Sequence, residues 1–194
     1  MNIGEEICGE WLRHIKGCEF VQYNLQTTHV QGEIDVIGIN LTERKIYVCE
    51  VAVHLVTGLN YVTGAKPDNV QRIVAKFRKD IAYARMQFPE YQHEFMLWSP
   101  VVKHAKADSK LNQMRDVQEV VDAIRTELDA TVELVINERF QTALDEMRSY
   151  ARAQTKELDS TVMRYLQVEE YLRKYLTLRK KKARNEAILA TAKA

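Results

Sequence analysis

The spacing of the apolar residues changes along the chain, and this change constrains the fold more than any other feature of the sequence. Up to about residue 136, segments with helical spacing alternate with short runs that are either continuously apolar or apolar at every second position. From Glu138 onward the sequence contains no Pro and no Gly, as expected for helices alone. The pattern predicts an α/β domain over residues 1–136 and an α-helical C-terminal extension over residues 137–194.

The expected elements follow one another as a helix, three strands, a helix, a strand, a helix, a strand and two helices. Their ranges are 3–16, Phe20–Asn24, Glu33–Ile39, Lys45–Val53, about 69–86, Phe95–Trp98, 108–128, Val132–Ile136, 138–153 and 156–190. Gly17 is well suited to end the first helix. Asn40–Arg44 is expected to form a hairpin loop, and Lys66–Asn69 a turn in which Asp68 or Asn69 caps the following helix.

The composition excludes several classes of protein. No stretch of about 18 apolar residues exists, so no membrane span is expected. The first ten residues are acidic and lack the basic start and apolar run of a signal peptide. Cys8, Cys18 and Cys49 are too few and too scattered for a disulfide scaffold or a CxxC metal site. We therefore expect a reducing, cytoplasmic setting.

Charge is distributed unevenly, although the net charge is only +1. Residues 1–130 carry 15 basic and 18 acidic side chains, whereas residues 131–194 carry 13 and 9. The densest basic run consists of Arg179, Lys180, Lys181 and Lys182. One interpretation is that this run contacts the DNA or RNA backbone; the other is that it aids solubility and complements the helix dipole.

The C-terminal extension has an apolar pattern of its own. Steps of three and four residues separate several large side chains, namely Leu158, Val162, Tyr165, Leu172 and Leu176. This stripe can pack on the protein's own domain. Alternatively it is a short coiled-coil seam for a homodimer or for a helical partner protein.

Two neighbouring predicted strands carry carboxylates inside otherwise apolar runs. Because side chains alternate between faces, Glu33 and Asp35 share one face of the first strand, and Glu50, Ala52 and His54 share one face of the second. If the strands pair, two or three carboxylates converge, which is costly unless a positive charge joins them. A divalent cation with oxygen ligands meets that need. The simpler interpretation is that these residues form a solvated face of the sheet.

These residues carry a resemblance. Gly32-Glu33-x-Asp35-x-Ile37, a hairpin, and then Val48-x-Glu50-Val51 resemble the PD-(D/E)xK nuclease superfamily, in particular the Holliday-junction-resolvase-like endonucleases. The opening segment Gly4–Leu12 is similar to the first helix of that group, with Cys8 at its small-residue position. The resemblance extends over roughly residues 4–98 and does not cover the C-terminal extension.

The resemblance implies a restriction-endonuclease-like mixed sheet flanked by helices, and metal-dependent hydrolysis of phosphodiester bonds in DNA. Asp35 and Glu50 would bind Mg²⁺ or Mn²⁺, and the Val51 carbonyl would be a further ligand. Glu5 would reach the metal from the first helix, directly or through water. Such a cation polarises the phosphate and activates a water molecule.

One departure from the motif stands out: Ala52 occupies the position of the superfamily's lysine. Ala52 cannot orient or deprotonate a water molecule, nor offset phosphate charge. A lysine on the following helix can take over this role, with Lys76 as first choice and Lys79 and Lys66 as further candidates. Alternatively catalysis is lost, and the chain is a nucleic-acid-binding module or an assembly adaptor that uses its C-terminal helices.

Overall fold

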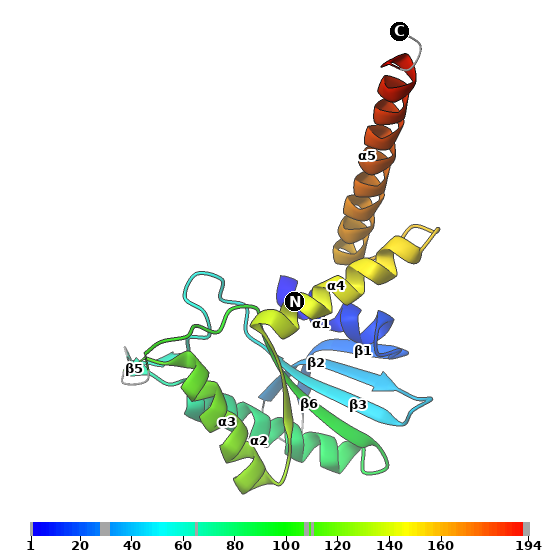
Figure 1. The fold of residues 1–194 in the computed structure, drawn as a ribbon. Helices are drawn as coiled ribbons and strands as arrows, with labels where there is room; N and C mark the ends of the chain where they lie inside the picture. Colours follow the sequence, from blue (N-terminus) through cyan, green and yellow to red (C-terminus); the bar gives the residue numbers. More distant parts are fainter. Residues whose placement is uncertain (1, 28–31, 65, 107–108, 110, 192–194) are drawn as a thin grey trace. The chain divides into compact units, whose positions relative to one another are not determined.

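A five-stranded mixed sheet forms the centre of the fold, in the order β1-β2-β3-β6-β7 (Figure 1). The structure is a computed structural model that describes residues 2–27, 32–64, 66–106, 109 and 111–191. Strands β1, β2 and β3 form an antiparallel meander, and β6 and β7 are added in parallel. The strands are β1 (Phe20–Thr27), β2 (Gly32–Asn40), β3 (Lys45–Val51), β6 (Gln92–Ser99) and β7 (Val132–Ile136). The predicted α/β class is confirmed.

Helices cover both faces of this sheet (Figure 1). Helices α2 (Asn69–Gln87) and α3 (Gln113–Leu128) connect the parallel strands, as parallel pairing requires. Their apolar faces share one core with Ile37 and Val48 of the sheet. The adjacent residue Gly38 points the other way, toward Leu12 of helix α1 (Ile3–His14). Alternation from Ile37 places Asp35 on the α2 side as well. Ile34 also belongs to this core, so the alternation is interrupted between residues 34 and 35.

Some element boundaries differ from those predicted. The predicted turn at Lys66–Asn69 is partly wrong, because Lys66–Pro67 forms the short strand β5, which pairs with β4 (Val62–Thr63). The tight turn lies earlier, at Gly64, whose φ of 58° favours glycine. Asp68 occupies the N-cap position of α2, but its side chain makes no capping hydrogen bond to the helix. The predicted start of the third helix at residue 108 lies outside the described residues.

Helix α1 lies unusually close to the sheet because glycines line the contact. A Cβ atom at Gly9 would overlap the ring and hydroxyl of Tyr23, and one at Gly38 would lie 2.9 Å from the Leu12 side chain. Trp11 fills the remaining space and meets Trp98 edge to face, with ring centroids 5.2 Å apart. Both tryptophans are buried, so α1 is held on the sheet by both close approach and aromatic packing.

The C-terminal region consists of α4 (Asn137–Ala153) and α5 (Thr161–Thr191). The chain divides into two compact units, unit 1 (Met1–Leu144) and unit 2 (Asp145–Ala194). The division therefore lies within α4 rather than at residue 136, because the first turns of α4 pack on the sheet domain, with Phe140 against Trp98. Within the described ranges, no helix combines the length and apolar character needed to cross a membrane.

We expect Gly9→Ala to lower the free energy of unfolding by about 1–3 kcal/mol, because it overpacks the contact with Tyr23. Helix propensity alone predicts the opposite sign, since Ala favours a helix over Gly by about 1 kcal/mol. Urea unfolding of Gly9→Ala, of Tyr23→Ala and of the double variant gives the coupling free energy between residues 9 and 23. An equal loss in both backgrounds would show that this contact does not limit the approach of α1.

Candidate active site

Strands β2 and β3 bring Asp35 and Glu50 together on the α2 side of the sheet. Their ladder pairs Val36 with Cys49, so the next positions outward are Asp35 and Glu50. Glu50 is only 2% exposed, and the Asp35 side chain is 14% exposed. Two carboxylates from adjacent strands therefore share one largely buried location, as the two-residue period predicted.

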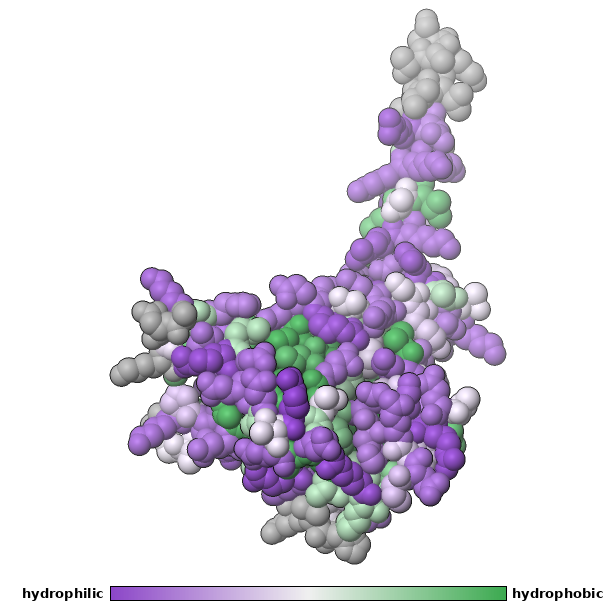
Figure 2. All heavy atoms as spheres, turned by 60° about the horizontal axis from the view of Figure 1, so that its bottom comes forward, coloured by the Kyte–Doolittle hydropathy of each residue, from purple (hydrophilic) through white to green (hydrophobic). Residues whose placement is uncertain are grey.

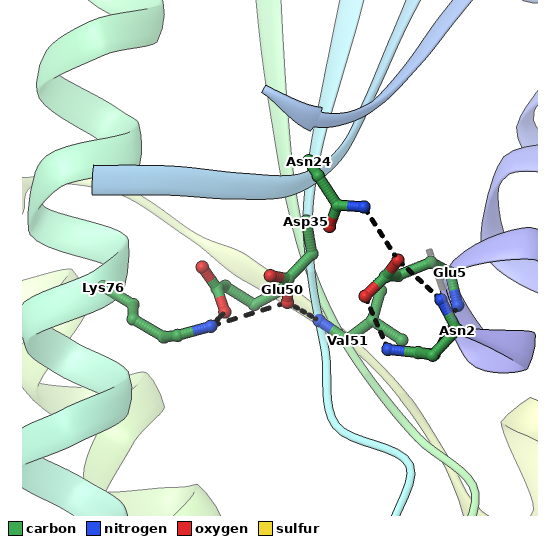
Figure 3. A network of polar contacts seen from close by, with 7 residues as sticks. All are labelled: Asn2, Glu5, Asn24, Asp35, Glu50, Val51 and Lys76. Atoms are coloured by element: carbon green, nitrogen blue, oxygen red, sulfur yellow. Dashed lines mark hydrogen bonds and ion pairs between the residues drawn. The ribbon is translucent and has the colours of Figure 1, made fainter. Parts of the chain in front are cut away.

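Lys76 of α2 joins both carboxylates (Figure 3). Its Nζ lies 3.5 Å from Asp35 Oδ2 and donates a hydrogen bond to Glu50 Oε2. Of the three lysines proposed to replace the missing motif lysine, Lys76 is the one that reaches the carboxylates. Lys66 lies exposed in β5, and Lys79 lies beside Gly32 at the start of β2.

The backbone of β3 fixes the orientation of Asp35. The Val51 N–H donates a hydrogen bond of 2.8 Å to Asp35 Oδ2. The next residue, Ala52, is buried in the core, and its N–H donates to the Trp98 carbonyl. The side chain at position 52 therefore serves the hydrophobic core. The positive charge beside the carboxylates comes from Lys76 of α2 instead.

Glu5 approaches from the other side, through the N-terminus of α1 (Figure 3). Its carboxylate accepts hydrogen bonds from the Asn2 N–H, from Asn2 Nδ2 and from Asn24 Nδ2 at 3.3 Å. The Glu5 N–H donates in turn to Asn2 Oδ1, which completes a capping box. Asn24 lies on β1 opposite Asp35, so Glu5 is tied to the strand that borders the site. Among the described residues, no three His, Cys, Asp or Glu side chains are arranged as a metal-binding group. Metal ligation by Glu5 stays a prediction.

Asp80 is a member of the site that the sequence analysis did not identify. It lies one helical turn after Lys76, is 3% exposed, and interacts electrostatically with Glu50 and Lys76. Asp80 lies between the core residues Phe77 and Ile81 in the sequence. A charged residue beside the apolar face of a helix could have indicated a buried, functional carboxylate.

The environment shifts the pKa of each buried group. Burial raises the pKa of Glu50 well above its ordinary value, with further increases from Asp35 and Asp80 and an opposing effect of Lys76. Burial likewise raises the pKa of Asp80 to about 7. Burial favours neutral Lys76, but Glu50 and Asp35 outweigh it and raise its pKa above the ordinary value. Lys76 is therefore a cation at neutral pH, suited to donate hydrogen bonds rather than to accept a proton.

Within the cluster of Asp35, Glu50 and Asp80, two buried carboxylate oxygens have no hydrogen-bond partner among the described residues. They are Glu50 Oε1 and Asp80 Oδ2. Unpartnered polar atoms are rare in protein interiors and are expected where an ion, a water molecule or a proton belongs. Carboxylate oxygens are the donors that Mg²⁺ and Mn²⁺ prefer, so the chemistry of this cluster fits a hard cation.

The predicted basic run belongs to the other unit of the chain. Arg179, Lys180, Lys181 and Lys182 are exposed on α5, in unit 2, whereas Asp35, Glu50 and Lys76 belong to unit 1. His54, a lower-ranked candidate, follows β3 and lies edge to face against Tyr61. Nucleic-acid binding by the basic run stays a prediction.

No protein-family model, curated protein or solved structure matches the chain. Its function is therefore inferred from the geometry of the site.

We expect Asp80→Asn to change how stability depends on pH. Folded Asp80 holds its proton more tightly than the unfolded chain does, so wild-type stability falls as the pH rises from about 4 to about 7. Asparagine removes this loss. Its gain in unfolding free energy over wild type should therefore be about 3 kcal/mol larger at pH 8 than at pH 5, because each of the two pH units up to about pH 7 contributes about 1.4 kcal/mol.

Urea unfolding at both pH values, in EDTA, measures this difference. Asp122→Asn, which changes an exposed carboxylate on α3, is the control. A gain that is the same at pH 5 and pH 8 would contradict the raised pKa of Asp80.

Proposed function

We propose that the chain is a PD-(D/E)xK-type endonuclease that hydrolyses phosphodiester bonds in DNA with Mg²⁺ or Mn²⁺. The observation that carries the proposal is the joining of Asp35 and Glu50, on adjacent strands, by Lys76. These are the two carboxylates and the cation of the motif, with the cation supplied from α2 instead of position 52. An antiparallel meander followed by parallel strands, with helices on both faces, is compatible with a restriction-endonuclease-like fold.

Asp35, Glu50 and the Val51 carbonyl are the groups that would hold the metal, with Glu5 as a further carboxylate. The unpartnered Glu50 Oε1 supports this assignment, because a ligand oxygen needs a free lone pair. When bound, the cation would polarise the phosphate, lower the pKa of a water molecule and stabilise the leaving oxygen.

The protein's own side chains have distinct roles in this proposal. Val51 holds Asp35 in one orientation, and Asn24 holds Glu5 beside β1. Lys76 keeps its charge at neutral pH, so it acts by orienting water and offsetting negative charge on the phosphate, not as a general base.

We expect Asp35→Ala and Glu50→Ala to abolish nicking of supercoiled plasmid in Mg²⁺ or Mn²⁺, because each removes a metal ligand. Lys76→Ala should reduce the rate about 10²–10³-fold, as is typical for loss of one preorganised electrostatic group. Lys76→Arg should keep more activity than Lys76→Ala, because it keeps the charge.

The matched control is Arg78→Ala, on the same helix but paired with Glu127 away from the site. Circular dichroism excludes unfolding of each variant. If Asp35→Ala cuts DNA as fast as wild type, the nuclease proposal is wrong. If neither wild type nor variants cut DNA but wild type binds it, the inactive nucleic-acid-binding alternative is the better one.

A second candidate function is assembly through the C-terminal helices, and the surface of α5 favours it. Large apolar side chains that are each at least 42% exposed follow one another along this helix: Tyr165, Val168, Tyr171, Leu172, Tyr175, Leu176 and Leu178. Figure 2 shows hydrophobic side chains among hydrophilic ones on the helical extension. The steps 165-168-172-175 are those of a coiled-coil seam, which a second copy of α5 would complete.

We expect the full-length protein to be a homodimer in size-exclusion chromatography with light scattering. Leu172→Glu combined with Tyr175→Glu should make it monomeric, because two charges in the seam must be desolvated on pairing. Lys174→Glu, between them in sequence but off the seam, should leave the dimer intact. A monomeric wild-type protein would exclude a second copy as the partner of α5.

A further inference from the structure

A groove opens beside the candidate active site, along the outer side of α2. It encloses about 490 Å³ and is lined by Tyr61, Asp68, Gln71, Arg72, Lys76 and Lys79, among others. Lys76 belongs both to the groove and to the cluster with Asp35 and Glu50. A ligand in this groove therefore lies directly next to the carboxylates.

The basic residues of α2 differ in whether an acidic side chain pairs with them. On other sides of the helix, Arg78 pairs with Glu127, and Arg85 donates to the Asp129 carbonyl. Arg72 donates from Nη1 to the Val62 carbonyl, which holds it at the groove. Within the described part of the chain, neither Arg72 nor Lys79 forms an ion pair. Their charge therefore remains available to an anionic ligand.

The spacing of the cations suits a chain of phosphates. Residues 72, 76 and 79 are four and three positions apart, so they lie on one side of the helix. Seven residues correspond to roughly 10 Å along the helix axis, about three phosphate-to-phosphate steps along one DNA strand. Arg72 and Lys79 thus lie on either side of Lys76 and can contact phosphates that flank the one directed to Lys76.

The rest of the lining does not oppose this ligand. The only carboxylate among the six residues named for the lining is that of Asp68, which accepts a hydrogen bond from the Thr63 hydroxyl. Gln71 is an exposed neutral donor on the same helix. Burial raises the pKa of Tyr61, so its phenol stays neutral and can donate to a phosphate oxygen.

We propose that this groove binds the phosphate backbone of a DNA strand through Arg72 and Lys79, with the intervening phosphate directed to Lys76. The inference rests on the proposed function for the identity of the anion, and it gives the site a way to position its substrate. Affinity would come from α2 in unit 1, independently of the basic run on α5. Such contacts carry no base specificity and weaken with salt.

Fluorescence anisotropy with a labelled 20-nucleotide DNA strand and its duplex, in EDTA so that no cleavage occurs, tests this inference on the full-length protein. We expect Arg72→Ala and Lys79→Ala each to weaken binding about tenfold. Each should also lower the slope of log K against log salt by roughly one. Arg72→Lys and Lys79→Arg should restore most of the affinity, because they keep the charge.

Arg78→Ala is the control on the same helix, and a variant with Arg179, Lys180, Lys181 and Lys182 all changed to Ala is the control for the α5 run. Both Arg72 and Lys79 are exposed, so neither substitution should alter the melting temperature. Unchanged affinity of Arg72→Ala and Lys79→Ala for both DNA forms, or no binding by wild type, would overturn the inference.

The failure of this inference can be told apart from the failure of the nuclease proposal. Asp35→Ala should bind at least as tightly as wild type, because it loses a negative charge beside the groove. If DNA binding depends on Arg72 and Lys79 but no cleavage occurs, the groove assignment holds and the nuclease proposal is wrong. If cleavage occurs and does not depend on Arg72 and Lys79, the nuclease proposal holds and the groove assignment is wrong.

Discussion

The ion pair of Lys76 with Glu50 and Asp35 is the interaction on which the centre of the domain depends. A carboxylate as buried as Glu50 is costly unless a cation, a metal ion or a proton compensates its charge. Lys76 supplies that charge from α2, so the pair fixes how the helix is rotated and how far along β3 it lies. The same charges that hold the helix on the sheet are those that the proposed chemistry uses.

The opposite face of the sheet is organised by shape rather than by charge. Gly9 and Gly38 allow α1 to approach where larger residues would overlap Tyr23 and Leu12. The capping box of Asn2 then directs the Glu5 carboxylate toward β1. Carboxylates therefore lie on both faces of the meander. Asp35 and Glu50 are on the face covered by α2, and Glu5 is on the other face, where the helix cap of α1 orients it.

The two units carry two different kinds of surface. Unit 1 combines buried carboxylates with a basic groove along α2, a combination suited to a polyanionic ligand. Unit 2 carries exposed apolar residues on α5 followed by a basic run, a combination suited to a helical partner. A nuclease that acts as a dimer would use both surfaces, whereas an adaptor would need only the second.

The sequence by itself determined the order of the main helices and of the five strands of the central sheet, the α/β class and the meeting of Asp35 with Glu50, because two- and 3.6-residue periods are local properties. It did not predict the short strands β4 and β5. It did not determine which of three lysines reaches these carboxylates, that Asp80 joins them, or that α4 begins on the sheet domain. Those outcomes depend on how each helix is rotated and positioned on the sheet. Packing between residues far apart in the sequence determines this arrangement. Only the tertiary structure therefore decided that the cation comes from α2 and that a basic groove lies beside it.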